Sequence, residues 1–206
     1  KQSLPAKIQA DTAEVNRLNR VAARYLQADL DSVYYFSKQA MDLASTIRYQ
    51  QGIAEAYLNY CLYNRMKGNT SVALEDGLKA LKIFESAGYK RGIARACLQI
   101  AQVYKETAGA ALTDEFLKLG VDYALQSYRL YESLQDTAEL SSSLNVAGII
   151  YRDPGKIKNQ SDFYDSAYNC YILGIELIKR TGKGMDNLGR LYNNISQVYM
   201  EHKIDY

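Results

Sequence analysis

Hydrogen-bonding and cationic side chains recur in this chain at intervals of about 40 residues, in segments that also resemble one another. Three asparagines share one position of the repeated segment: Asn19, Asn145 and Asn193. Five cations lie within two residues of the ends of these segments: Arg65, Arg95, Lys105, Arg152 and Arg190. A side-chain amide both donates and accepts hydrogen bonds, so it can hold an extended peptide backbone, and a guanidinium pairs with a carboxylate through two nitrogens. The chemistry that these residues offer is recognition of a peptide with acidic groups.

The sequence contains no comparable set of residues that could form a catalytic or metal-binding site. The only histidine is His202, and no cysteine or second histidine accompanies it as a zinc site would require. The glycines within residues 92–97 and 181–189 lack the spacing of a phosphate-binding loop. We therefore expect no catalytic residue, no metal and no cofactor in this chain, and no enzyme activity.

Three cysteines lie inside apolar helical patterns: Cys61, Cys97 and Cys170. They are too few and too scattered for a disulfide framework, and cysteine in such a pattern acts as a small apolar residue. A disulfide between Cys61 and Cys97 is the alternative that the sequence leaves open.

Composition favours packed helices and argues against two classes of partner. The 206 residues include 19 Tyr, only two Pro and no Trp, and the formal net charge is +2. Lys and Arg form no large cluster, so we expect no nucleic-acid binding by this region. No apolar run reaches the roughly 18 residues that suggest a membrane span, so membrane attachment would require a flanking span. The chain begins with Lys1, and we expect it to be a fragment of a longer protein.

Five segments align and share a small residue on an apolar helical face: 18–25, 57–64, 97–104, 144–151 and 192–199. The small positions are Ala22, Cys61, Ala101, Gly148 and Ser196, which are separated by 39, 40, 47 and 48 residues. Apolar residues at helical spacing around each small position indicate an amphipathic helix with a notch, against which another helix can pack closely.

A second helical pattern follows each of the first four segments, and its small residues recur seven apart. The pairs are Val33 and Ala40, Ala73 and Ala80, Gly120 and Ser127, and Ala167 and Gly174. The two patterns together predict four helix hairpins, followed by an unpaired first helix that ends near Met200. N-caps of three second helices are predicted at Asp31, Asn69 and Asp165.

The third and fourth hairpins each contain seven additional residues between their two helices. From Asn64 to Ala73 is nine residues in the second hairpin, whereas from Tyr151 to Ala167 is sixteen in the fourth. Because residues 153–155, Asp-Pro-Gly, are a turn signal, we expect these insertions to form surface loops on one rim.

The pattern resembles the tetratricopeptide repeat, a helix-turn-helix unit of about 34 residues with a Tyr near the end of its first helix. Four residues match that Tyr: Tyr25, Tyr104, Tyr151 and Tyr199. The consensus Trp is absent, and the period is longer. The resemblance implies an all-α fold, a right-handed α-solenoid of about 4.5 hairpins in a single domain over residues 1–206. Its repeats would span about 12–50, 51–90, 91–137, 138–184 and, incompletely, 185–206.

In such solenoids the first helix of each hairpin lines a concave groove. We predict that a ligand-binding row lies there: Asn19, Leu58, Leu62, Arg65, Arg95, Leu98, Gln102, Lys105, Asn145, Ile149, Arg152, Arg190, Asn193 and Gln197. Asn16 and Glu55 lie one turn earlier on the same side. The alternative for any single polar residue is plain solvation. The Lys and Asn clamp for chaperone C-termini is not reproduced, because Ala23 stands where that clamp needs Asn.

The Gly-Ile-Ala starts at 52–54 and 92–94, together with residues 11–19, also resemble the tetratricopeptide region of sensor histidine kinases and related regulators in Bacteroidetes. That resemblance implies a periplasmic sensor or interaction region of a signal-transduction protein, which binds a protein or peptide or forms a homodimer. Any kinase activity would lie outside these residues. The alternative is a stand-alone cytoplasmic scaffold or adaptor that assembles a protein complex.

Overall fold

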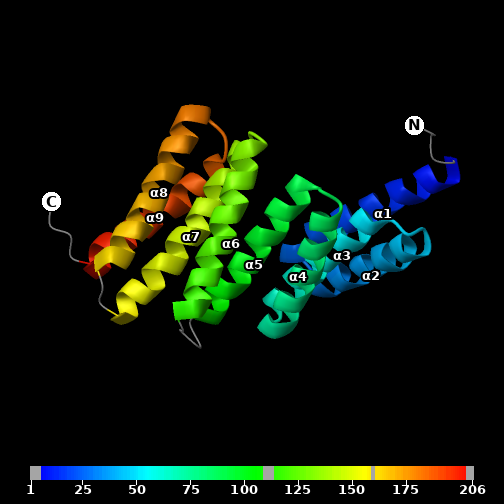
Figure 1. Ribbon diagram of the computed structural model, residues 1–206, viewed down its shortest axis with the longest axis horizontal. Helices are drawn as coiled ribbons and strands as arrows, with labels where there is room; N and C mark the ends of the chain where they lie inside the picture. Colours follow the sequence, from blue (N-terminus) through cyan, green and yellow to red (C-terminus); the bar gives the residue numbers. More distant parts are fainter. Residues whose placement is uncertain (1–5, 109–113, 159–160, 203–206) are drawn as a thin grey trace. The chain divides into compact units, whose positions relative to one another are not determined.

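The computed structural model describes residues 6–108, 114–158 and 161–202, and these residues form helices with no strand among them (Figure 1). The helices are α1 (Ala6–Arg24), α2 (Leu30–Thr46), α3 (Gln50–Met66), α4 (Thr70–Ser86), α5 (Lys90–Ala108), α6 (Asp114–Ser133), α7 (Thr137–Lys158), α8 (Ser161–Thr181) and α9 (Met185–His202). A short 3-10 helix, η1 (Tyr25–Gln27), follows α1. The predicted all-helical fold of consecutive hairpins is confirmed.

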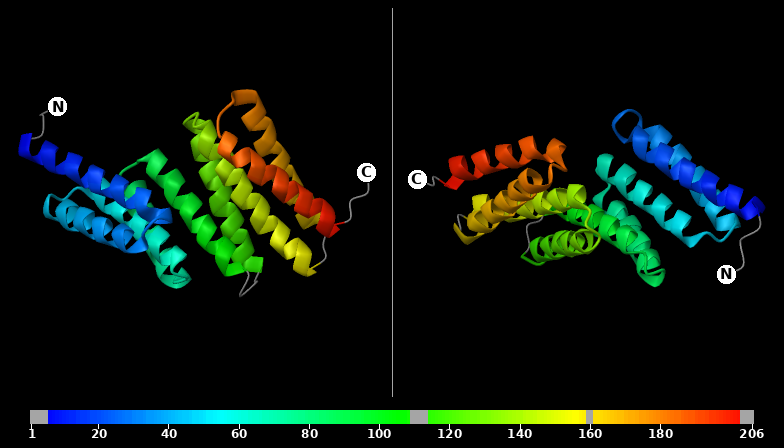
Figure 2. Two further views of the ribbon diagram at one scale, coloured as in Figure 1. Left: turned by 180° about the vertical axis from the view of Figure 1, so that it is seen from behind. Right: turned by 90° about the horizontal axis from the view of Figure 1, so that it is seen from above.

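The contacts divide the chain into two compact units, Lys1–Gln99 and Ile100–Tyr206, whose boundary lies within α5. Unit 1 contains the hairpins α1–α2 and α3–α4 and the first half of α5. Unit 2 contains the rest of α5, α6, the hairpin α7–α8 and α9. In unit 1, α1, α2, α3 and α4 each pack on the next, and α1 also contacts α3; in unit 2, α6, α7, α8 and α9 do the same, and α7 also contacts α9 (Figure 2). Each unit is therefore a solenoid-like array of helices.

Three-residue connections with one shared backbone geometry end four of the helices. A residue in the left-handed region follows each helix: Arg48 after α2, Gly68 after α3, Gly88 after α4 and Gln135 after α6. The next amide donates to the carbonyl five residues earlier, as the amide of Asn69 does to the carbonyl of Asn64 at 2.8 Å. This ending satisfies carbonyls that a helix terminus leaves open and turns the chain back at once, so an antiparallel helix follows.

Small residues let the helices of each unit approach closely. The predicted notches Ala22, Cys61, Ala101 and Gly148 are buried, and so are all eight small sites predicted in the second helices. Ser196 differs, because it is exposed on α9, which has no following helix among the described residues to cover that side. Large side chains fill the space beside small residues: Phe84 lies beside Gly92 in unit 1 and Tyr171 beside the notch Gly148 in unit 2, and both rings are fully buried.

The predicted turn at residues 153–155 is wrong, because these residues lie inside α7. Helices α7 and α8 have 22 and 21 residues, whereas α3 and α4 have 17 each. The fourth hairpin therefore uses its additional residues to lengthen helices. Proline removes one backbone hydrogen bond, but packing against a neighbouring helix contributes most of the stability of a helix in a protein and can outweigh that loss. The remaining parts of the predicted loops, 109–113 and 159–160, lie outside the described residues.

Of the three predicted N-caps, Asn69 is confirmed at the N-cap position of α4, whereas Asp31 and Asp165 are wrong. Helix α2 is capped by Asp29, whose carboxylate accepts from the amides of Asp31 at 3.1 Å and Ser32 at 3.3 Å. Asn69 precedes α4 but makes no side-chain capping bond, and Asp165 lies one turn inside α8. The sequence has two candidate caps here, Asp29 and Asp31. Only Asp29 has the extended backbone that directs a side chain toward the free amides of the first turn, because Asp31 already lies inside α2.

An acidic side chain, Asp76, is buried between α4 and α3, with 8% of its surface exposed. Its carboxylate accepts a hydrogen bond from the Asn64 amide at 2.9 Å. Burial raises the pKa of this carboxyl, although Asn64 and the ammonium of Lys79 act in the opposite direction. The folded state therefore binds the proton more tightly than the unfolded chain, so the free energy of unfolding falls as pH rises through the raised pKa.

Replacing Asp76 with asparagine is expected to stabilise unit 1 at neutral pH. The variant keeps an oxygen for the Asn64 amide and removes the buried charge, so the free energy of unfolding at pH 7 should rise by roughly 0.5–2 kcal/mol. The gain should shrink as pH falls from the raised pKa toward the ordinary carboxyl pKa of 3.8, and it should be lost below 3.8, where both states of the wild type become protonated. Urea titrations at several pH values measure it. Asp42→Asn, at an exposed position, is the control, and an equal response of both variants would contradict the prediction.

Candidate functional site

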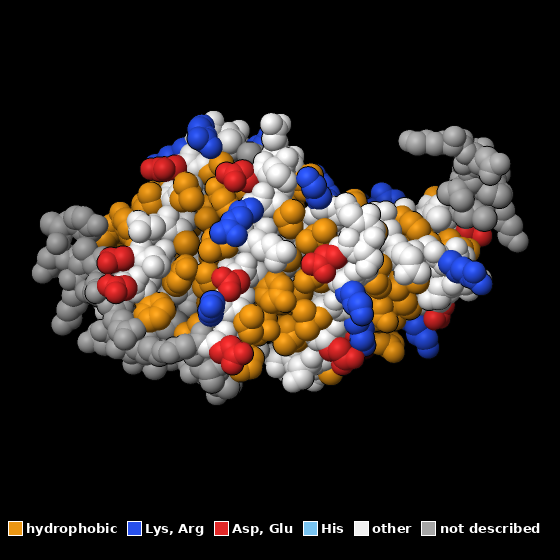
Figure 3. Space-filling view, in the orientation of Figure 1, with side chains coloured by type: hydrophobic (Ala, Val, Ile, Leu, Met, Phe, Trp, Pro, Cys, Tyr) orange, Lys and Arg blue, Asp and Glu red, His pale blue; other side chains and the backbone are white. Residues whose placement is uncertain are grey.

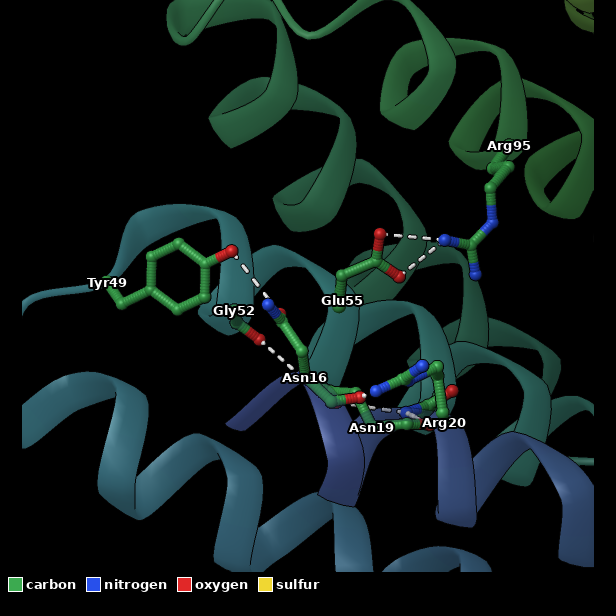
Figure 4. Close-up of polar contacts among 8 residues, drawn as sticks. Asn16, Asn19, Arg20, Tyr49, Gly52, Glu55 and Arg95 are labelled. Carbon is green, nitrogen blue, oxygen red and sulfur yellow. Dashed lines mark hydrogen bonds and ion pairs between the residues drawn. The ribbon is translucent and has the colours of Figure 1, made fainter. Parts of the chain in front are cut away.

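A polar pocket of about 270 Å³ opens on unit 1 where α1, α3 and the first half of α5 face the same side (Figure 4). Its lining residues come from the three first helices of successive hairpins: Asn16, Asn19, Arg20, Ala23, Gln51, Glu55 and Arg95. We call this the unit 1 pocket. It lies on the face of the first helices where the sequence predicts ligand binding, and it includes Asn19 and Arg95 from the predicted row.

An ion pair between Arg95 and Glu55 forms one wall of the unit 1 pocket. One terminal nitrogen of Arg95 lies 2.7 and 2.6 Å from the two carboxylate oxygens of Glu55. The Glu55 side chain is 16% exposed and the Arg95 side chain 40% exposed. The charge of Arg95 is therefore balanced within the unit, rather than left open for a ligand as the sequence alone suggests.

The positive charge that remains in the unit 1 pocket belongs to Arg20, which the predicted row does not contain. The Nε of Arg20 donates to the carbonyl of Asn16 at 3.2 Å, which holds the guanidinium along α1. Its terminal nitrogens have no acceptor among the described residues, and the side chain is exposed. Two guanidiniums and one carboxylate line the pocket, so its formal charge is positive.

Asn16 supplies a further donor. Its amide oxygen accepts from the Tyr49 hydroxyl at 3.3 Å, which leaves the amide nitrogen without an acceptor among the described residues. Donors from Arg20 and Asn16 therefore lie beside an already paired Arg95. The arrangement is complementary to a ligand with a carboxylate or carbonyl oxygen.

Several other predicted row residues of unit 1 lie in its interior. Leu58 and Leu98 are buried, and Leu62 and Arg65 are half-buried. Asn19 is buried too, although it reaches the edge of the pocket: its amide nitrogen donates to the carbonyl of Gly52 at 3.1 Å. Its oxygen accepts from the Asn59 amide, also at 3.1 Å. Asn19 therefore joins α1 to α3, and its hydrogen bonds are not available to a peptide.

The predicted residues of unit 2 show a similar division. Asn145 accepts from the Asn194 amide at 2.8 Å, Ile149 packs against the core around Tyr171, and Gln102 and Lys105 are half-buried. Arg190 and Asn193 are exposed, and they line neither the hollow beside Leu140 and Leu144 nor the pocket beside Ile150 and Tyr151.

Arg152 is engaged by side chains of its own unit. It donates to the oxygen of Gln197 and contacts Asp153 at 3.1 Å and Glu201 at 3.9 Å. Its side chain is only 15% exposed. A second predicted cation of the row is thus neutralised by acidic neighbours, as Arg95 is.

The alignment of the repeats contains the information that predicts the Arg95–Glu55 ion pair and the two asparagine pairs. Asn16, Glu55 and Arg95 each lie six residues before the notch of their helix, so they stand next to one another in successive first helices. Opposite charges at one position of consecutive repeats therefore predict an ion pair. The asparagine pairs follow one rule. The acceptor, Asn19 or Asn145, lies three residues before the notch of its helix, and the donor, Asn59 or Asn194, lies two residues before the notch of the following repeat. Comparing positions between repeats would have found both contacts.

The described cysteines are all free thiols, so Cys61 and Cys97 form no disulfide. Burial raises the pKa of Cys97 to about 12 and that of Cys170 to about 11. These thiols are neutral at physiological pH and are poor nucleophiles. In the ranges that the structure covers, no three His, Cys, Asp or Glu side chains come together as a metal site, and no helix is long and apolar enough to cross a membrane.

Charged side chains on the face drawn in Figure 3 are interspersed by sign, with Lys and Arg next to Asp and Glu. No large patch of one sign is visible on that face. Ion pairs within single helices of the described residues include Arg17 with Glu14 at 2.7 Å and Lys79 with Glu75 at 2.7 Å.

Comparison with solved structures finds a similar fold in the crystal structure of BtubC (BKLC) from P. vanneervenii. The TM-score is 0.70, and the match covers 98% of this chain and 85% of that chain, with 16% sequence identity. At this identity the likeness shows the fold alone. No protein-family profile matches the chain. No curated protein matches it either.

Proposed function

We propose that this chain is a non-catalytic binding module of the tetratricopeptide class, and that unit 1 holds an extended peptide or protein segment with an acidic group. The observation that carries the proposal is the exposed guanidinium of Arg20, which lies in the unit 1 pocket without a carboxylate partner among the described residues. The side chains that line this pocket include no His, Cys, Ser or Thr that could act as a nucleophile or a base at neutral pH.

The size of the unit 1 pocket favours side chains of a peptide over a drug-sized molecule. Its volume of about 270 Å³ is just below the roughly 300–1,000 Å³ of small-molecule sites. An extended segment would place one acidic side chain against Arg20, while its backbone carbonyls accept from the Asn16 amide. Because Arg95 is already paired with Glu55, the wild-type pocket offers a ligand only the guanidinium of Arg20.

Binding of randomised hexapeptides on an array tests this proposal. The peptides carry a central Glu and a free C-terminus, or a central Gln and an amidated C-terminus. We expect the acidic set to bind at least tenfold more tightly, and Arg20→Gln to remove the difference, because one charge-assisted pair contributes about 1.5–3 kcal/mol. Glu55→Gln should instead strengthen binding of the acidic set several-fold, because it releases Arg95.

The matched control is Arg17→Gln, which removes the same charge from α1 at an exposed residue that pairs with Glu14 outside the pocket. This variant should bind both peptide sets as the wild type does. Equal binding of both sets, or equal losses in Arg17→Gln and Arg20→Gln, would rule out the pocket as a carboxylate site. A gain of affinity in Glu55→Gln cannot arise from partial unfolding, so it separates binding from stability.

Within this proposal, the chain acts as the sensor or interaction region of a bacterial signal-transduction protein of the histidine kinase type, on the periplasmic side. The support is the sequence resemblance around residues 11–19 and at the two Gly-Ile-Ala starts. The alternative is a cytoplasmic scaffold that assembles a complex through the same pocket. A parent reading frame with a membrane span and kinase motifs would favour the sensor, and one without them would favour the scaffold.

A further inference from the structure

A larger hollow of about 790 Å³ lies in unit 2, outside the surface used by the proposed function. It runs between the C-terminal ends of α6 and α8, and the first half of α7 forms its floor. Four leucines provide the floor and one wall: Leu140, Leu144, Leu173 and Leu177. We call this the unit 2 groove. Leu173 is 44% exposed, so part of this apolar surface faces solvent.

The second hairpin shows what fills the same place in unit 1. Counted from the notches and small sites, Leu144 corresponds to Tyr57, and Leu173 corresponds to Lys79. In unit 1 the ammonium of Lys79 lies over the Tyr57 ring, 5.6 Å from its centre. One turn further along α4, around Ile83, a hollow of only about 310 Å³ remains. The unit 2 groove is thus open because two leucines replace an aromatic ring and the long cation that covers it.

The rim of the unit 2 groove carries both signs of charge. Glu132 of α6 accepts from the Tyr128 hydroxyl at 3.1 Å on one side. On the other side, Glu176 is followed one turn later by Arg180, near the end of α8. Lys179 also lines the groove, but its ammonium lies over the Tyr192 ring, 5.7 Å from its centre. With two carboxylates and two cations the rim has no net positive charge that would select a fatty acid or other simple anion. A partner with alternating charges beside an apolar stripe would complement the rim.

The surface of the unit 2 groove favours a helix as that partner. All of its lining side chains except Gln135 stand on three helices, whose backbone groups are largely bonded within the helices, so an extended strand would find few backbone partners. A helix satisfies its own backbone. From Leu173 to Arg180 is seven residues, about 10 Å or two turns, which matches anchors at i, i+3 or i+4 and i+7 of a docked helix.

We propose that the unit 2 groove binds an amphipathic helix of a partner protein. The apolar face of that helix covers the four leucines, an acidic residue pairs with Arg180, and a basic residue faces Glu132. The contact is independent of the unit 1 pocket, so the chain has two separate binding surfaces, one for an extended acidic segment and one for a helix.

Selection from a displayed library of helical peptides tests this inference. The library fixes Leu at i, i+3, i+4 and i+7 and randomises the flanking positions. Binders should lose at least tenfold in affinity for the double variant Leu144→Tyr/Leu173→Lys, which installs the pair that the second hairpin carries. A separate selection on Arg180→Glu should recover a basic residue in place of the acidic one. Arg17→Gln, at an exposed residue outside both binding surfaces, serves as the matched control and should leave the affinity unchanged.

The single variant Leu173→Lys keeps the test valid if the double variant fails to fold, because Leu173 is half exposed. Each of the following outcomes would overturn the inference: no binders, binders that keep their affinity for both filled variants, or binders without helical circular dichroism. Two other results would assign a different occupant. They are concentration-dependent self-association that the filled variants abolish, and saturable binding of decanoate in the groove.

Discussion

Replacing Gly148 with alanine is expected to lower the free energy of unfolding by about 2 kcal/mol, because packing in unit 2 leaves no room for the added methyl group. The new Cβ would lie 2.8 Å from Cδ1 and Cζ of Tyr171, and closer still to Cε1. Tyr171 is fully buried and packs against Ile175, Leu191 and Val198, so its ring cannot move aside without disturbing the core. This repulsion outweighs the ~1 kcal/mol by which alanine is favoured over glycine in a helix.

Gly189 provides the matched control for this substitution. It lies in α9, and a Cβ built on it meets no atom within 4 Å. Gly189→Ala should therefore raise the free energy of unfolding by up to ~1 kcal/mol, opposite in sign to Gly148→Ala. A cycle with Tyr171→Leu isolates the clash, since the alanine should cost about 1 kcal/mol less once the ring is gone. Similar melting temperatures for the two alanine variants would show that Gly148 is no packing notch.

The notches could be predicted from the sequence because their cause is steric and local to each repeat. A small residue at one position of an apolar helical stripe, repeated at intervals of about 40 residues, has few explanations besides close helix packing. Ala22, Cys61, Ala101 and Gly148 all follow it. The turn predicted at residues 153–155 is wrong because proline and glycine indicate only the local preference of the backbone. The packing of α7 on α8 is a tertiary effect, which that local signal does not contain.

The candidate site was less predictable, because a recurring polar residue can bind a ligand or bind the next repeat. Asn19 and Arg95 have the right chemistry and lie on the right face, but each has a partner 40 residues away. Arg20 has the same chemistry, and the neighbouring repeat places no carboxylate beside it. The periodicity of the sequence predicted which face of the helices carries the pocket. It could not predict which polar side chains on that face are free to bind a ligand, because that depends on which of them already bond to a neighbouring repeat.

Replacing Asn59 with leucine is expected to destabilise unit 1 by about 2 kcal/mol, the cost of leaving a buried polar group without its partner. The Asn59 amide donates at 3.1 Å to both the side-chain oxygen and the carbonyl of Asn19, and the side chain is only 2% exposed. Leucine has a similar volume, so the lost hydrogen bonds and not a cavity should dominate. Urea denaturation followed by circular dichroism measures the change.

The double variant Asn19→Leu/Asn59→Leu separates the hydrogen bonds from the packing. Asn59→Leu leaves the buried Asn19 oxygen without its donor, and Asn19→Leu removes one of the two acceptors of the Asn59 amide. The double variant leaves neither side chain of this pair to be satisfied, so its cost should be clearly smaller than the sum of the two. Asn193→Leu in α9 is the control, because Asn193 has the same repeat position as Asn19 but an exposed side chain. This variant should change the free energy of unfolding by no more than about 0.5 kcal/mol. Strict additivity of the two core substitutions would mean that the asparagines contribute independently, and the amide pair would then not be what joins α1 to α3.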